Sequence, residues 1–366
     1  MPHKITNSKN LQRETLRKIV KNEKLDAKVR QLAQLRIDYS EDSKNLTSYI
    51  NQLVGKKRVY MHHLPTQASG RWSTFDPPIT NWPRACINPT CPKGEHEWED
   101  GCWSIRDILT ADDDEVLITW DHDNIEGKIH DLIVENEEKI KAHAEGYDLH
   151  TITCCKMFKY ELPINLKNPH SSEEDRAWRA RYNWQGKDTK VRVLAKNFNH
   201  GSKYTESYMF VHKITGIEKY GISYKELEEL ARQYIVSEGN AWERKCAIME
   251  RIRRERIARS LYGFRRVFFD ASPETGREGF SHMISATVSD YNNMTLQLLR
   301  KKYGKLGVLL HNAHDGNKFV IKKVYVNFHY GNDVTAFKKD LASVIEREIR
   351  YKNRALTMTA GVKIYA

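Results

Sequence analysis

Apolar and polar positions change period along the chain, and the sharpest change surrounds Asp121. Residues 116–120 form a largely apolar run that predicts a buried β-strand, which brings Asp121 to the end of that strand. Apolar residues then recur at helical spacing through residues 125–133. Further along, residues 308–321 contain two apolar runs around an Asp-Gly pair, which indicates a hairpin with His314 and Asp315 at its tip.

The remaining apolar positions predict several helices and two more strands. Helical spacing covers most of residues 1–60, 190–204, 224–259, 280–299 and 336–350. Residues 324–328 and 360–365 are interpreted as strands, and the polar residues 159–188 as an exposed excursion. The resulting order of elements predicts an α+β fold interrupted by a helical region.

The composition indicates what kind of partner the protein binds. The 366 residues carry a formal net charge of +12, which favours a polyanionic partner such as nucleic acid. There is no apolar run long enough to cross a membrane and no signal peptide, and six cysteines are too few for a disulfide scaffold. We therefore expect a reduced, cytoplasmic protein without membrane contact.

Three cysteines and a histidine between residues 86 and 102 form a candidate metal site. Cys86, Cys91, His96 and Cys102 supply four ligands of the types that bind structural zinc. Their spacing is looser than in the commonest zinc knuckles, so three reduced cysteines in a loop remain the alternative.

Carboxylates and cations are arranged for phosphate chemistry. Asp121 and Asp315, on adjacent strands, could share two divalent cations. The acidic run 112–115 is interpreted instead as a solvated turn, because four consecutive charges do not converge easily. Arg192, Lys196, His200 and Tyr204 recur every fourth residue, so cations and rings share one helix face that suits a nucleoside triphosphate.

Six motifs in order resemble the polymerase region of a family A DNA polymerase, the bacterial DNA polymerase I and phage replicative type. The resemblance runs from about residue 30 to the end. The motifs are Ser69-Gly70-Arg71 with Asn81; Asp121 to Lys128; Asp148-Leu-His150-Thr151; Arg192-x3-Lys196-x3-His200-x3-Tyr204; Arg277 before Phe280; and His314-Asp315.

This resemblance implies a right-hand polymerase that adds dNTPs to a primer. Asp121 and Asp315 would hold two Mg²⁺ ions, and Lys196 would be the proton donor to pyrophosphate. Arg192 and His150 would meet the phosphates, His200 and Tyr204 the base region, and Glu126 would exclude a 2′-hydroxyl. The residues implied to contact DNA are Arg71, Asn81, Arg277, Ser285 and His314.

The resemblance also implies a division of the chain and a setting for it. Residues 1–60 would be an abbreviated helical thumb or arm, 61–135 the first part of an antiparallel-sheet palm, 136–275 helical fingers, and 276–366 the rest of the palm. We expect no proofreading exonuclease in this chain, and therefore a separate exonuclease or processivity factor as partner. The source implied is a bacterial or phage-infected cell.

Departures from the family pattern bear on selectivity rather than on the metal ligands. His200 stands where Phe or Tyr is usual, Thr205 where Gly is usual, and Ser285 where Gln is usual. Lys128 replaces Arg, and Gly316 replaces the usual Glu after His-Asp.

Three other interpretations compete with the polymerase. A truncated or degenerate polymerase could bind primer-template without catalysis. A single-subunit RNA polymerase shares the hand, but Glu126 argues against room for a 2′-hydroxyl. A metal-dependent phosphohydrolase could use pairs such as His122-Asp123, but it predicts helices where the pattern predicts strands.

Overall fold

The structure is a computed structural model that describes residues 13–45, 51, 53–55, 62–65, 67–75, 110–202, 223–313, 316–331 and 333–365. The chain divides into two compact units, one of residues 1–64 with 73–110 and one of residues 65–72 with 111–366. None of the described helices has the length and apolar content to span a membrane.

The first unit contains two helices and a short strand pair among its described residues. Helices α1 (Arg13–Lys21) and α2 (Ala27–Asn45) pack through Leu16, Ala33 and Ile37. Strands β1 (His62–Leu64) and β2 (Ser73–Phe75) pair antiparallel, and the rings of His62 and Phe75 stack. The helices expected in residues 1–60 are thus present where the structure describes that range.

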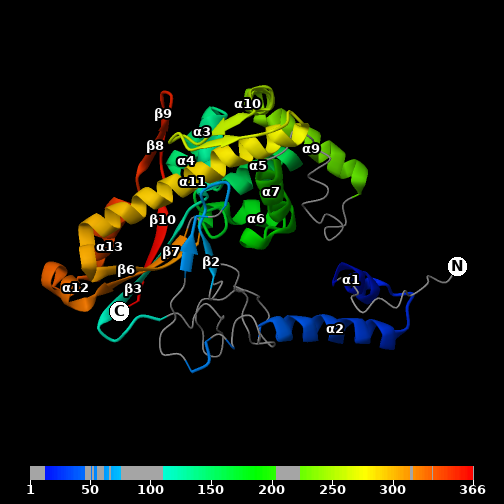
Figure 1. The fold of residues 1–366 in the computed structure, drawn as a ribbon. Coiled ribbons are helices and arrows are strands. Elements are labelled where there is room, and N and C mark those ends of the chain that lie inside the picture. The colour runs from blue at the N-terminus through cyan, green and yellow to red at the C-terminus, as the bar shows by residue number, and fades with distance from the viewer. Residues whose placement is uncertain are drawn as a thin grey trace. The chain divides into compact units, whose positions relative to one another are not determined.

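A four-stranded antiparallel sheet organises the second unit (Figure 1). Its order is β10 (Ala360–Tyr365), β3 (Glu115–His122), β7 (Gly316–Lys322) and β6 (Gly307–Ala313). Side chains of β3 alternate in burial, with Val116, Ile118 and Trp120 facing the core, as the period of two requires. The predicted central strand, hairpin and last strand are confirmed.

The long helix α11 (Pro273–Tyr303) runs across the second unit (Figure 1), and its side chains contribute to two hydrophobic cores. Ser272 caps its first turn by accepting from the Thr275 amide, and Pro273 follows at the first helical position. One core, with the sheet and α13 (Val334–Ile345), contains Leu299 and Phe337. The other contains Phe280 and Ile284. It is completed by α3 (Ile125–Ile133), α10 (Asn240–Glu255) and the hairpins β4 (Ile257–Arg259), β5 (Arg265–Val267) and β8 (Glu348–Tyr351), β9 (Arg354–Thr357).

A third core holds the helical insertion together. Its main helices are α5 (Leu149–Phe158), α7 (Lys190–Gly201) and α9 (Tyr224–Glu238), which bury Leu194, Phe198 and Leu227 between them. Nearby elements are α4 (Glu137–Glu145), α6 (Arg176–Arg181) and the short turns η4 (Glu173–Asp175) and η5 (Gly186–Asp188). Residues 159–188 are therefore less exposed than predicted, because Trp178 and Trp184 anchor them in this core.

Two other predictions near the C-terminus are corrected. Residues 324–328 lie in helix α12 (Lys323–Tyr330), not in a strand, because Val326 and Tyr330 pack one helical turn apart. Residues 336–350 are not one helix: α13 ends at Ile345, where its buried stripe ends, and β8 follows.

The glycine at 279 is required by close packing between α10 and α11. A Cβ built there would lie 2.3 Å from Ile252 Cγ2, a methyl group fixed on a β-branched side chain. We expect Gly279→Ala to lower the free energy of unfolding by about 1–3 kcal/mol, although alanine favours helices. Denaturant unfolding of Gly279→Ala, Ile252→Ala and the double variant measures this. Additive effects would contradict the contact, because removing the methyl should relieve the clash.

Candidate functional site

Asp121 lies near the end of β3, between two glycines on the neighbouring strands. It pairs in register with Gly316 of β7 and with Gly361 of β10. A Cβ built on Gly316 would lie 3.0 Å from Asp121 Oδ1 and 3.1 Å from the Trp120 carbonyl oxygen. Asp121 is exposed, and neither of the two residues paired with it on the neighbouring strands has a side chain.

The hairpin that carries His314 and Asp315 is described up to both sides of its tip. Those two residues lie outside the described part. Strand β6 ends at Ala313 and strand β7 begins at Gly316, and these two residues pair with each other. Just below, three buried asparagines join the hairpin to α11. Asn292 Nδ2 donates to Asn312 Oδ1 at 3.1 Å, and Asn317 Nδ2 donates to Asn292 Oδ1 at 2.7 Å.

Glu126 and Arg71 form an ion pair although 55 residues separate them. Glu126 lies in the first turn of α3, whose preceding residue, Asn124, has a left-handed φ of 49°. Arg71 follows Gly70, whose φ is 72°, so a glycine turn directs the arginine toward α3. The structure thus brings together a predicted DNA-contact residue and the predicted 2′-hydroxyl filter.

Helix α7 divides the predicted phosphate stripe between a buried and an exposed part. Arg192 is 7% exposed, whereas Lys196 and His200 are exposed. The His200 ring lies 5.5 Å from that of His150 on α5, centre to centre. Lys196, His200 and His150 therefore remain together as a candidate triphosphate surface, and Tyr204 lies outside the described residues.

The Arg192 guanidinium is occupied by a buried ion pair with Asp148. Its Nε and Nη2 each donate to the carboxylate at 3.0 Å, and Nη1 donates to the Lys187 carbonyl oxygen at 2.9 Å. His170 Nε2 also contacts Asp148, at 2.7 Å. Burial alone would raise the pKa of Asp148, but Arg192 and the hydrogen bonds outweigh burial and hold this pKa below its usual value.

The remaining predicted residues fall into two groups. Arg277 pairs with Glu274 within the first turns of α11, and Ser285 is 9% exposed on the same helix. Asn81 and the four candidate zinc ligands lie outside the described residues, so their roles stay predictions. These ligands are Cys86, Cys91, His96 and Cys102.

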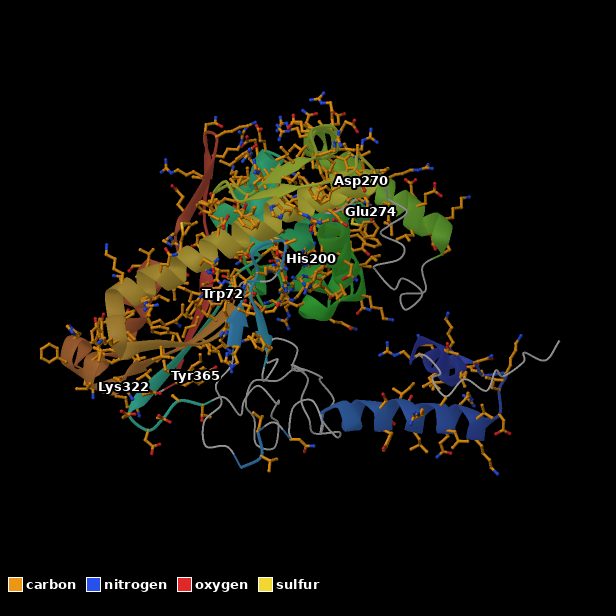
Figure 2. All side chains as sticks on the ribbon, in the orientation of Figure 1. Trp72, His200, Asp270, Glu274, Lys322 and Tyr365 are labelled. Atoms are coloured by element: carbon orange, nitrogen blue, oxygen red, sulfur yellow. The ribbon has the colours of Figure 1, made fainter. Side chains whose placement is uncertain are left out.

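The acidic run at 112–115 converges more than predicted. Oxygens of Asp112, Asp114 and Glu115 lie within 4.8 Å of one another, and Lys322 Nζ is 2.9 Å from both Asp114 and Glu115. Figure 2 shows Lys322 toward one end of the sheet, far from His200. This cluster is therefore separate from the candidate triphosphate surface.

His122 does not fit the phosphohydrolase interpretation. It alternates with Asp121 along β3, so its ring is buried, edge-on to Tyr291. Burial lowers the pKa of His122 to about 4, although a backbone hydrogen bond at Thr359 opposes the shift. The imidazole is thus a neutral core group at neutral pH, on the opposite face of β3 from the carboxylate.

The sheet and the helical insertion give this chain a fold similar to that of a DNA polymerase I polymerase domain. A scan against known family models gives no match. The polymerase domain of Pol1 from M. smegmatis, solved with DNA primer-template and dNTP, superposes with a TM-score of 0.69 at 16% identity. The match covers 96% of this chain and 55% of that chain, and it shows the fold.

The curated relatives are also polymerases of the DNA polymerase I type. The chain is 24% identical over 301 residues to thermostable DNA polymerase I of Thermus filiformis, covering 78% of this chain and 31% of that protein. It is 25% identical over 295 residues to the enzyme of Thermus thermophilus. The chain thus spans about a third of the length of these relatives. The predicted resemblance to a family A polymerase region is confirmed.

We expect Asp148→Asn to destabilise the second unit by about 3 kcal/mol, because it leaves the buried Arg192 charge without a carboxylate. Since the folded pKa of Asp148 is lowered, the wild-type advantage is full above about pH 3.9 and is lost as pH falls through the folded pKa. Urea unfolding across pH measures this effect.

The control for this prediction is Asp148→Asn combined with Arg192→Met. The double variant should recover part of the lost stability, since no buried charge remains unpaired. If it is as unstable as the sum of the two single changes, the ion-pair explanation is wrong.

Proposed function

We propose that this chain is a template-directed DNA polymerase that transfers nucleotides from dNTPs to a primer 3′-hydroxyl. The observation that carries the proposal is the register of β3 on β7. Asp121 pairs with Gly316, the residue that follows Asp315 in the sequence. In this proposal, Asp121 and Asp315 would together supply the two carboxylates that in-line nucleotidyl transfer with two metal ions uses.

The donor set around Asp121 fits Mg²⁺. Carboxylate oxygens are the ligands this cation prefers, and the residues paired with Asp121 on the two neighbouring strands are Gly316 and Gly361. Asp121 and Asp315 would hold the two ions, which when bound activate the 3′-hydroxyl and neutralise the leaving pyrophosphate.

The fingers residues would then bind the triphosphate. Lys196 and His200 are exposed on one face of α7, with His150 beside them, so a cation and two imidazoles face the same solvent region. Lys196 would compensate phosphate charge and donate the proton to pyrophosphate. Arg192, whose N–H groups already serve Asp148, would act mainly by holding α7 against α5, with Tyr204 completing the nucleotide side.

The primer-template would contact the residues outside this triphosphate surface. Arg71 and Glu126 form one pair, so an arginine drawn toward the DNA would change the surroundings of the 2′-hydroxyl filter. Asn81, Arg277, Ser285 and His314 are the other proposed DNA contacts. The net charge of +12 supports a polyanionic substrate.

In the proposed hand, the β3–β7 sheet with α11 is the palm and the α4–α10 insertion is the fingers. The helices of residues 1–60 are the thumb. A separate exonuclease or processivity factor stays a prediction.

We expect Asp121→Asn and Asp315→Asn each to reduce primer extension at least about 100-fold while leaving primer-template binding within a few fold. Each change removes one negative charge from the proposed metal site. Extension of a 5′-labelled primer and binding by anisotropy provide the measurements. Asp123→Asn is the matched control, because Asp123 is exposed two residues further along. Full extension by Asp121→Asn would refute the metal assignment.

We expect Glu126→Ala to raise incorporation of rNTPs relative to dNTPs by at least about tenfold, because it opens the space that a 2′-hydroxyl needs. Glu126→Gln separates size from charge, since it keeps the volume but loses the ion pair to Arg71. A filter that acts by size should keep its selectivity in Glu126→Gln. Equal relaxation in both variants would assign selectivity to the ion pair instead. Single-nucleotide incorporation kinetics measure the ratio.

A further inference from the structure

A buried amide on α7 links the candidate triphosphate surface to a charged group behind it. Asn199 is 6% exposed and lies one residue before His200. Its Nδ2 is 3.1 Å from His150 Nδ1 and donates to Thr153 Oγ1 at 2.9 Å. Its Oδ1 accepts from Lys139 Nζ at 3.3 Å. The amide therefore stands between the imidazole and a lysine.

The surroundings allow only one orientation of this amide. An ammonium is solely a donor, so the atom facing Lys139 must be the oxygen. The Tyr234 hydroxyl accepts from Ser202 Oγ at 2.7 Å and directs its own proton to Asn199 Oδ1 at 3.4 Å. Turning the amide over would place its NH₂ group against two donors, the Lys139 ammonium and the Tyr234 hydroxyl.

Lys139 keeps its charge although it is largely enclosed. It pairs with the buried carboxylate of Glu238 and lies 5.4 Å from the centre of the Tyr234 ring. Burial alone would lower the pKa of Lys139, but Tyr234, Glu238 and Asp131 outweigh burial and raise it. The donor that orients the amide is thus present across the neutral range.

With its oxygen committed to Lys139, Asn199 presents N–H to His150. An N–H donor requires a lone pair on His150 Nδ1, so the ring proton must be on Nε2. Protonating Nδ1 would place two donors against each other. Among the described residues, the His200 ring centre lies 5.5 Å from the His150 ring centre, and the Asp148–Arg192 ion pair lies at the start of α5.

We propose that Asn199 is a positioning residue that holds His150 as the neutral Nε2–H tautomer, so that Nε2–H can donate to a phosphate oxygen of the incoming nucleotide. The nucleotide part of this inference rests on the proposed function, whereas the tautomer is a property of the free chain. A neutral donor contributes a directed hydrogen bond and leaves charge compensation to Lys196.

The first test is ¹⁵N NMR of the free full-length chain labelled at histidine, with the His150 signal assigned by its loss in His150→Gln. We expect an unprotonated Nδ1 and a protonated Nε2 at neutral pH. A protonated Nδ1, alone or in an imidazolium, would overturn the proposal whatever the activity of the chain. This measurement needs no variant of Asn199 to fold.

The second test is Asn199→Asp, which replaces the N–H donor with an acceptor and should move the proton to Nδ1. We expect kcat/KM for dNTP to fall about 10- to 100-fold, with primer-template affinity unchanged. Thr153→Val is the matched control, because Thr153 hydrogen-bonds the same amide, while the Lys139 and His150 contacts of Asn199 remain in this variant. It should keep the wild-type ¹⁵N pattern and activity within about threefold.

The two tests distinguish the effect of Asn199 on the His150 tautomer from the contact between His150 and the nucleotide. An unchanged ¹⁵N pattern in Asn199→Asp would overturn the positioning role. A proton that moves to Nδ1 without any change in kcat/KM would overturn the nucleotide contact. If the wild-type chain has the expected tautomer but extends no primer under any condition, the proposed function fails while the tautomer assignment stands.

Discussion

The register of β3 between β7 and β10 is the constraint on which the candidate site depends. Val116, Ile118 and Trp120 point into the core, so the pleat directs Asp121 to the other face. A slip of one residue would expose these apolar side chains and bury the carboxylate, and burial of several large apolar groups opposes that slip by several kcal/mol. The position of a charged group at the surface is thus determined by hydrophobic packing behind it.

The helical insertion depends on a polar counterpart of this constraint. Asp148 joins α5 to α7 through Arg192, and Asn199 joins the same helices through Thr153 and His150. Since buried polar groups are costly to leave unpaired, rotation of α7 about its axis would break both sets of bonds together. The buried polar bonds of α7 therefore determine which way its exposed side chains point.

The sequence predicts best where one period dominates a segment. Strand β3, the hairpin and β10 follow from alternating or continuous apolar runs, and Asp121 lies where the pattern puts it. Residues 324–328 are rich in β-formers, yet they form α12 because contacts with α13 decide there.

The contacts that orient the site could not be predicted from the periodicity of the sequence. Arg192 meets Asp148 across 44 residues and Asn199 meets His150 across 49, and no local spacing encodes such pairs. The sequence therefore predicts Arg192 as a phosphate ligand, whereas in the structure its guanidinium donates to Asp148 and to the Lys187 carbonyl oxygen. Asn199 and Lys139 carried no signal of their own, because an asparagine and a lysine in helices are ordinary surface residues until the fold encloses them.

Gly316, which stands where the family pattern has glutamate, lies directly beside Asp121 in the sheet. A glutamate there, as the pattern would have it, would begin with a Cβ 3.0 Å from Asp121 Oδ1 and add a like charge beside that carboxylate. Glycine removes both the steric contact and the repulsion, at the cost of one carboxylate near the proposed metal site. Asp121 and Asp315 would then have to hold the cations without a third acidic neighbour at this position. The proposed site would then depend more on the precise positions of these two carboxylates. The buried Asn292, Asn312 and Asn317 hold strands β6 and β7 against α11.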